Sequence, residues 1–247
     1  MRAVWVREAR NLLRFERRAA AASAVTLFVS RQEAARFAEL GPEARARIDW
    51  VENGVDLDAF SPARAWPDPF PNPGPHLVFT GHMDYWPNID AVQWFAAEVM
   101  PRLCARRPAP RFWIVGANPS EAVKQLAALP GVHVTGRVPA VQPYIAHAAA
   151  CVSPLRMARG IQNKVLEAMA MGRPVVASPQ AFEGVRAEAG THLLVADGAE
   201  ETARAVLAVL DGRYPRLGEM ARRAMEEGYA WKATLRRLDA HITRCLA

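Results

Sequence analysis

Residues 151–178 read CVSPLRMARGIQNKVLEAMAMGRPVVAS, and this stretch decides the fold. A short apolar run ends at a proline, a polar loop follows, and residues 162–171 are rich in Ala, Leu, Met and Glu, which is typical of a helix. Gly172 then ends the helix, and Pro174 precedes the short strand-like run VVAS at residues 175–178. The pattern predicts a βαβ unit. The loop after its first strand lies at the carboxyl edge of the sheet, where open α/β folds bind ligands.

Lys164 and Glu167 stand one turn apart near the start of this predicted helix. A helix N-terminus offers unpaired N–H groups and positive partial charge, which suit a diphosphate, and Lys164 adds a full charge. The Glu167 carboxylate can accept both hydroxyl groups of a ribose. The pair therefore predicts a nucleoside diphosphate site, because the apolar residues around it leave little of the helix for solvent. The alternative is a Lys–Glu pair on a solvated helix face.

A proline-rich segment divides the chain, with six prolines between residues 62 and 75. It cannot join a helix or a central strand. Before it, we expect a helix at 4–22, a strand at 24–29, a helix at 31–40 and a strand at 48–52. After it, strands are expected at 76–80, 111–115, 132–134, 151–153, 175–178 and 192–195. Helices are expected at 89–106, 120–129, 139–148, 162–171 and 200–210, followed by a helical tail at 216–247 with a break near Tyr229 and Trp231. This alternation predicts a parallel doubly wound α/β sheet.

Three strand ends carry glycine, at Gly81, Gly116 and Gly136. Glycine lets the main chain approach a ligand closely. In a parallel sheet these ends share one carboxyl edge with the loop that leads to Lys164. We therefore expect the glycines and that loop to outline one site.

Two other motifs favour a structural role. Asp56 and Asp58 have the DxD spacing of some metal sites, but they directly follow an Asn-Gly turn signal, so we expect them to shape a turn. Tyr85, Trp86 and Trp94 offer a stacking platform for a base. Because Trp94 falls in the middle of a predicted helix, we expect it to pack in the core instead.

The composition bounds the class of protein. At 247 residues with 51% apolar content, the chain can bury one substantial core. No apolar run approaches the roughly 18 residues that span a bilayer. Three cysteines, odd in number and far apart, make neither a disulfide framework nor a CxxC site, which favours the cytoplasm. The scattered histidines predict no metal site.

The net charge of +6 gathers in two places. Residues 1–22 hold six arginines against two glutamates, and a second cluster lies in the C-terminal helices. Neither cluster is interleaved with aromatic residues, so no nucleic acid partner is expected. Peripheral contact with the inner face of a membrane, or a phosphate-bearing lipid acceptor, fits such clusters. The alternative is an arginine-rich, solvated helix.

Five segments, in order and spacing, resemble glycosyltransferase family 4, whose members are retaining enzymes of the two-lobed GT-B fold. More narrowly, they are similar to the sugar transferases associated with bacterial PEP-CTERM exopolysaccharide loci. The segments are NGVDLDAFSP (53–62), VFTGHMDYWPNIDAVQWF (78–95), FWIVGANP (112–119), VTGRV (134–138) and GIQNKVLEAMAMGRPVVAS (160–178).

The resemblance implies a site for a nucleotide-diphospho-sugar that needs no metal and no other cofactor. Its base would lie near Val138 and its phosphates between Gly81 and the loop before Lys164, which would stabilise the leaving group. The implied donor-binding residues are Gly81, His82, Gly136, Val138, Arg159, Gly160, Ile161, Gln162, Asn163, Lys164 and Glu167.

Two departures from the family pattern stand out. The family has two glutamates separated by seven residues, and the first falls on Arg159 here. His82 and Met83 replace a phosphate-binding Arg and Lys of many relatives. Lys164 would then supply the missing positive charge.

The implied activity is transfer of a hexose to a lipid-linked or growing exopolysaccharide acceptor. The alternatives are a non-catalytic nucleotide-binding module and a GT-B nucleotide-sugar epimerase. The implied organisation is a remnant of the acceptor lobe (1–60), a linker (61–75), a Rossmann-like donor-binding domain (76–212) and C-terminal helices that fold back on the N-terminal part (213–247). Since a lobe needs on the order of 150 residues, an N-terminal truncation is expected, with the acceptor-side catalytic residues outside the chain.

Overall fold

The computed structural model describes residues 2–246 and divides the chain into two compact units. The larger unit spans Val55–Ala230, and the smaller combines Met1–Gly54 with Trp231–Ala247. None of the helices within residues 2–246 is long and apolar enough to cross a membrane.

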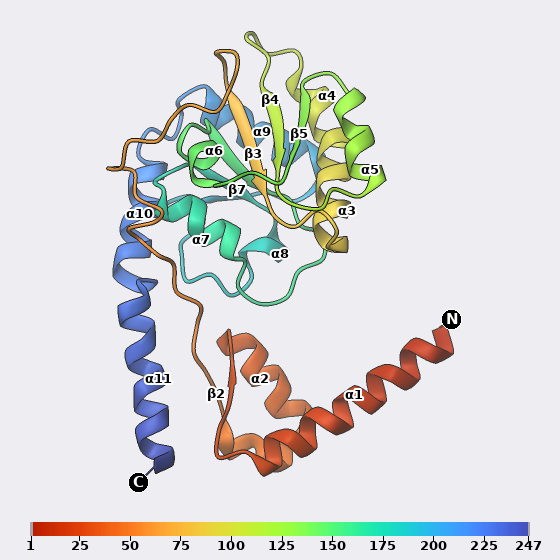
Figure 1. The fold of residues 1–247 in the computed structure, drawn as a ribbon, viewed down its shortest axis with the longest axis vertical. Helices are drawn as coiled ribbons and strands as arrows, with labels where there is room; N and C mark the ends of the chain where they lie inside the picture. The colour runs from red at the N-terminus through yellow and green to blue at the C-terminus, as the bar shows by residue number, and fades with distance from the viewer. Residues whose placement is uncertain (1, 247) are drawn as a thin grey trace. The chain divides into compact units, whose positions relative to one another are not determined.

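The larger unit contains a six-stranded, fully parallel sheet (Figure 1). The strand order is β5-β4-β3-β6-β7-β8. The strands are β3 (His76–Thr80), β4 (Arg111–Val115), β5 (Val132–Gly136), β6 (Ala150–Ser153), β7 (Val175–Ala177) and β8 (Leu194–Val195). The order reverses direction between β3 and β6, as in a doubly wound sheet, so the predicted fold class is confirmed.

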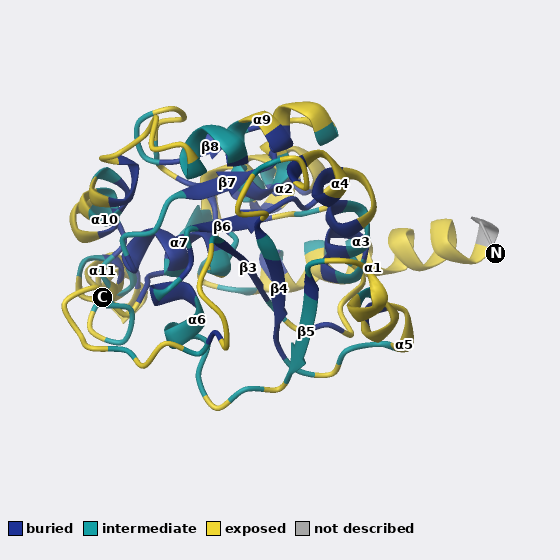
Figure 2. Cartoon of the chain, turned by 90° about the horizontal axis from the view of Figure 1, so that it is seen from above, coloured by how far each residue is buried: buried dark blue, intermediate teal, exposed yellow. Residues whose placement is uncertain are grey.

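Helices cover both faces of this sheet (Figure 2). On one face, α3 (Trp86–Trp94) continues through a π-helical turn (Phe95–Val99) into α4 (Met100–Leu103), and α9 (Gly198–Leu210) packs beside them. On the other face, α7 (Asn163–Ala170) covers β6 and β7 and is backed by α10 (Leu217–Gly228). Shorter helices are α5 (Glu121–Lys124), which continues into a 3-10 turn at Gln125–Ala128, α6 (Gln142–Ala146) and α8 (Pro179–Phe182).

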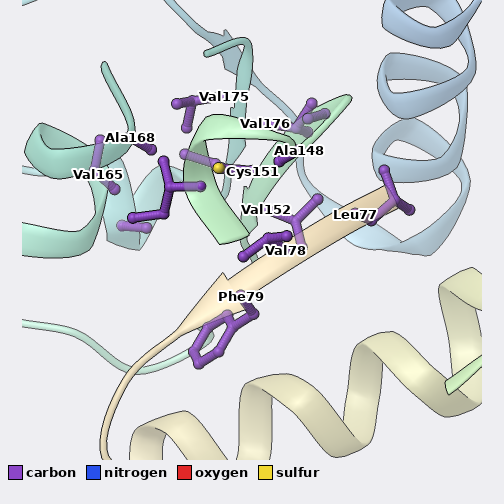
Figure 3. Close-up of a cluster of buried hydrophobic side chains, with 14 of the residues drawn as sticks. Leu77, Val78, Phe79, Ala148, Cys151, Val152, Val165, Ala168, Val175 and Val176 are labelled. Atoms are coloured by element: carbon purple, nitrogen blue, oxygen red, sulfur yellow. The ribbon is translucent and has the colours of Figure 1, made fainter. Parts of the chain in front are cut away.

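The strands β3, β6 and β7 are buried throughout because their residues face helices on both sides. Leu77, Val78 and Phe79 of β3 are at most 1% exposed and lie in the centre of the core (Figure 3). Continuous apolar runs of this kind are typical of central parallel strands. Trp94 packs against the same core, which confirms its predicted structural role.

The proline-rich residues 61–75 form neither helix nor strand, but they are packed onto the larger unit. The Phe70 ring stacks on the ring of His76 with centroids 3.8 Å apart. The carbonyl of Trp66 accepts a hydrogen bond of 2.8 Å from His147. The Phe70 ring and the Trp66 carbonyl thus fix a segment that the sequence suggests is only a linker.

The smaller unit combines N-terminal and C-terminal elements. Strands β1 (Thr26–Phe28) and β2 (Ile48–Trp50) pair in parallel. Its helices are α1 (Arg2–Ala22), α2 (Arg31–Leu40) and α11 (Trp231–Leu246), and a 3-10 turn covers Pro42–Arg47. Arg237 of α11 pairs with Asp49 at 3.4 Å and lies 4.0 Å from the ring centroid of Trp50.

The unit boundaries differ from the predicted divisions at residues 60 and 213. The chain divides at Gly54 and Ala230, so that α11 alone joins the N-terminal part. Helix α10 stays with the larger unit because its buried residues Leu217 and Met225 pack in the large core, next to α7.

Close main-chain contact at Gly116 predicts a stability effect. Gly116 has a φ of +153°, and an added Cβ would lie 1.7 Å from the Gly81 carbonyl oxygen. Gly116→Ala should therefore lower the free energy of unfolding by about 2 kcal/mol or more, as measured by urea denaturation. Gly136→Ala is the control, since its φ is +69° but nothing lies within 4 Å of the added Cβ. Equal losses in the two variants would contradict a specific clash at Gly116.

Candidate functional site

A cavity of about 810 Å³ opens at the carboxyl edge of the six-stranded sheet. It lies where the strand order reverses between β3 and β6, the usual ligand position in open α/β sheets. Its walls come from the loops after β3, β4 and β5 and from the start of α7. The lining residues are Thr80, Gly81, His82, Tyr85, Asn88, Gly116, Ala117, Arg137, Val138, Val141, Ile161, Gln162, Asn163, Lys164 and Glu167.

The cavity brings together most of the residues proposed from the sequence. Those that line it are Gly81, His82, Val138, Ile161, Gln162, Asn163, Lys164 and Glu167. Within residues 2–246, the lining does not include Gly136, Arg159 or Gly160. Gly136 contacts the cavity wall through its main chain, since its carbonyl accepts a hydrogen bond of 3.3 Å from the N–H group of the lining residue Gly116.

Arg159 points away from this cavity. It is largely exposed and lies 3.6 Å from the carboxylate of Glu183. The part of the loop before Arg159 is fixed by Arg156, which forms a bidentate ion pair with the buried Asp90 of α3. The proposed donor role of Arg159 therefore lacks support from its position.

Lys164 is half-buried in the cavity wall. Its ammonium group donates a hydrogen bond of 2.5 Å to Asn88 Oδ1 and lies 4.3 Å from the ring centroid of Phe79. Within residues 2–246, no ion pair joins Lys164 to a carboxylate. The ammonium group thus faces the cavity with the amide of Asn88 as its hydrogen-bond partner.

Burial shifts both charged groups of α7 toward neutrality. Burial lowers the pKa of Lys164 to about 7, and the Glu167 carboxylate partly offsets this fall. Burial likewise raises the pKa of Glu167, and Lys164 acts in the opposite direction. In the described part of the chain, no donor hydrogen-bonds the Glu167 carboxylate. A ligand with an anionic group and hydroxyl donors would satisfy both side chains.

Two helix N-termini also meet the cavity. Tyr85 and Gln162 are the N-cap residues of α3 and α7, and neither makes a side-chain capping bond. Neither helix has an acidic residue in its first turn. Their positive partial charges therefore add to that of Lys164 and favour an anionic ligand.

Sequence reasoning missed several lining residues as site members. Asn88 is the most important, because it contacts Lys164 directly. Its place in the first turn of the helix that follows Gly81 is the only sequence signal that points to it. The others are Thr80, Tyr85, Ala117, Arg137 and Val141, whereas Gly116 lines the cavity as expected from its strand end.

The two aspartates with DxD spacing shape a turn, as expected. Asp56 Oδ1 accepts hydrogen bonds from the N–H groups of Asp58 and Ala59, at 3.0 and 2.8 Å. Across residues 2–246, no group of three or more His, Cys, Asp or Glu side chains could hold a metal ion.

Residues 74–212 match the family described as glycosyl transferases group 1. The chain belongs to this family. The match covers all six strands and the complete cavity. None of the curated protein sequences compared with it matches.

Solved structures show the same fold at low sequence identity. A glycosyltransferase from Rickettsia africae is 17% identical with a TM-score of 0.75, over 90% of this chain and 63% of that protein. Sucrose-phosphate synthase from Thermosynechococcus elongatus is 19% identical with a TM-score of 0.75, over 96% of this chain and 62% of that one. Anabaena HepE, in complex with UDP and glucose, is 12% identical with a TM-score of 0.70, over 90% of this chain and 63% of that protein.

These likenesses confirm the expected GT-B, Rossmann-like fold. The present chain spans less than two thirds of the length of each of these three proteins.

Proposed function

We propose that the larger unit binds the donor of a retaining glycosyltransferase of family 4, a nucleotide-diphospho-sugar. The observation that carries this proposal is that one cavity is lined by a lysine and a glutamate with no ion pair between them. Lys164 lacks a carboxylate partner and Glu167 lacks a donor within the described residues, and both line the same space. A nucleoside diphosphate supplies an anion for the first and ribose hydroxyl groups for the second.

In the proposed reaction, an acceptor hydroxyl replaces the nucleoside diphosphate at the anomeric carbon with retained configuration. The bond from the anomeric carbon to the diphosphate oxygen breaks, a bond to the acceptor oxygen forms, and the proton of the acceptor hydroxyl passes to the departing nucleoside diphosphate. Negative charge then grows on the leaving diphosphate. Lys164 and the N-termini of α3 and α7 would stabilise this charge without a metal.

The acceptor is proposed to be a lipid-linked or growing exopolysaccharide of a PEP-CTERM-associated system. The family membership and the sequence segments quoted above support this assignment. Anabaena HepE was solved with UDP-glucose, and a pneumococcal O-GlcNAc transferase of the same fold was solved with UDP and GlcNAc. These ligands make UDP the first nucleotide to test.

One observation favours a non-catalytic nucleotide-binding module as the second candidate. Arg159 stands where the family has its first glutamate, and its side chain pairs with Glu183 outside the cavity. Release of UDP from a UDP-sugar in the presence of an acceptor would distinguish an enzyme from such a module.

Glu167→Gln should weaken binding of UDP or GDP roughly 5- to 150-fold, because a charge-assisted hydrogen bond to the ribose is lost, worth about 1–3 kcal/mol. Isothermal titration calorimetry in the presence of EDTA measures this change. The matched control is Glu183→Gln, which changes a carboxylate outside the cavity and should leave the affinity unaltered. Binding that needs a divalent metal, or equal affinities of wild type and Glu167→Gln, would contradict the proposal.

A further inference from the structure

Asn88 occupies a buried position between two parts of the cavity wall. Its side chain is 5% exposed and comes from the first turn of α3. Its Nδ2 donates a hydrogen bond of 2.8 Å to the carbonyl of His82, and its Oδ1 accepts the bond from Lys164. Because the His82 carbonyl can only accept, it orients the amide so that the oxygen faces Lys164.

Gly81 leaves the space that this arrangement needs. A Cβ at Gly81 would lie 2.7 Å from Asn88 Nδ2 and 3.3 Å from Lys164 Nζ. The amide and the ammonium group therefore lie against the main chain of the loop after β3. Gly81 and His82 of that loop also line the cavity.

We propose that Asn88 is a positioning residue of the donor site, which holds the Lys164 ammonium group beside Gly81, where a diphosphate would bind. The inference rests on the proposed function for the identity of the ligand. The hydrogen bond to Oδ1 also favours the charged form of Lys164, in opposition to burial. Asn88 thus sets both the place and the charge of the one lysine in the cavity wall.

Other titratable and charged groups belong to the cavity wall or to the elements packed around Lys164. Glu167 lies on the same helix, His82 follows β3, and Arg137 follows β5 on the cavity wall. Cys151 of β6 has its pKa raised to about 12 by burial, so it stays neutral at ordinary pH. Asp90 of α3 is paired with Arg156. None of these groups is changed by a substitution at Asn88.

The chain contains three lysines, Lys124, Lys164 and Lys232, which makes the test direct. NMR of 13C-labelled lysine in the unliganded protein follows the titration of each, with Lys164 assigned from Lys164→Met. Asn88→Leu, which removes the acceptor at similar size, should lower the midpoint of Lys164 by about one pH unit. Asn88→Asp, which keeps an acceptor and adds a negative charge, should raise it.

Opposite shifts in these two variants support the inference, because a merely structural role of Asn88 would not produce them. An unchanged Lys164 midpoint in folded Asn88→Leu overturns it. If Asn88→Leu does not fold, the absence of a rise in Asn88→Asp overturns it. UDP titration is read separately: Asn88→Leu should weaken UDP about tenfold at pH 7. If wild type itself does not bind UDP, the proposed function fails, while the NMR midpoints still decide the role of Asn88.

Discussion

Lys164→Met should raise the Kd for UDP or GDP at least about 100-fold at pH 6.5, because the lost contact is a charge-assisted hydrogen bond in a partly desolvated site. Methionine keeps an apolar side chain of similar length but removes the ammonium group, which lies 4.3 Å from the ring centroid of Phe79. Isothermal titration calorimetry measures the change. Lys124→Met is the matched control, since Lys124 is exposed on α5, pairs with Glu121 and should not affect binding.

The same interaction predicts how binding depends on pH. Burial lowers the pKa of Lys164 to about 7 in the unliganded protein. A bound diphosphate favours the ammonium form and raises that pKa, so binding above pH 7 takes up a proton. The affinity of the wild type should therefore fall as the pH rises above 7, by at most about tenfold per pH unit. In Lys164→Met this decrease should disappear. A pH-independent wild type, or tight binding by Lys164→Met, would show that the diphosphate lies elsewhere.

Arg222→Met should lower the free energy of unfolding by about 2–4 kcal/mol. Arg222 Nη1 donates to the carbonyl groups of Leu57, Phe60 and Ala170, at 3.2, 2.8 and 2.8 Å. It thus joins the turn after Val55 to the end of α7, the helix that carries Lys164. Without the guanidinium group, these carbonyl groups lose their donor in a partly buried place, which is the source of the loss.

Arg223→Met provides the control for Arg222, from the next position of the same helix. Arg223 is 56% exposed and pairs only on the surface with Glu219, so its loss should cost less than about 0.5 kcal/mol. Urea denaturation of both variants measures the two losses in the free energy of unfolding. Similar small losses would mean that the three carbonyl contacts of Arg222 contribute no net stability.

Two neighbouring inner strands of the sheet were predictable from the sequence to the residue. Strands β3 and β4 have the predicted bounds, because a parallel strand that is buried on both faces requires a continuous apolar run. Helix α7 was predicted within a residue at each end from its composition and from Gly172, whose φ of +67° ends the helix. The place of most of the proposed site followed from the predicted sheet, since strand ends in one parallel sheet share an edge.

Helix ends were less predictable. The helix expected at 89–106 begins at Trp86 and ends at Leu103, with a π-helical turn at Phe95–Val99. The helix expected at 139–148 is limited to Gln142–Ala146. Terminal turns depend on packing and on competing hydrogen bonds, which local propensity does not specify.

Individual side-chain partners were decided only by the tertiary structure. Arg222 and Arg223 look alike in a basic cluster, but one is 18% exposed and holds three carbonyl groups while the other is solvated. Arg159 occupies the position of a site glutamate in the family pattern, but its side chain pairs with Glu183 instead.

Asn88 and Lys164 show most clearly which features the sequence determines and which depend on the tertiary structure. The sequence by itself determined the parallel sheet, the site edge and the place of Lys164 at that edge, because these follow from apolar patterns and from the order of motifs along the chain. It did not reveal that Asn88, 76 residues earlier, contacts that lysine. The contact exists because β6 pairs with β3 rather than with β5, the strand before it in the chain. This pairing depends on how all the strands and helices pack together, and no local segment of the sequence encodes it.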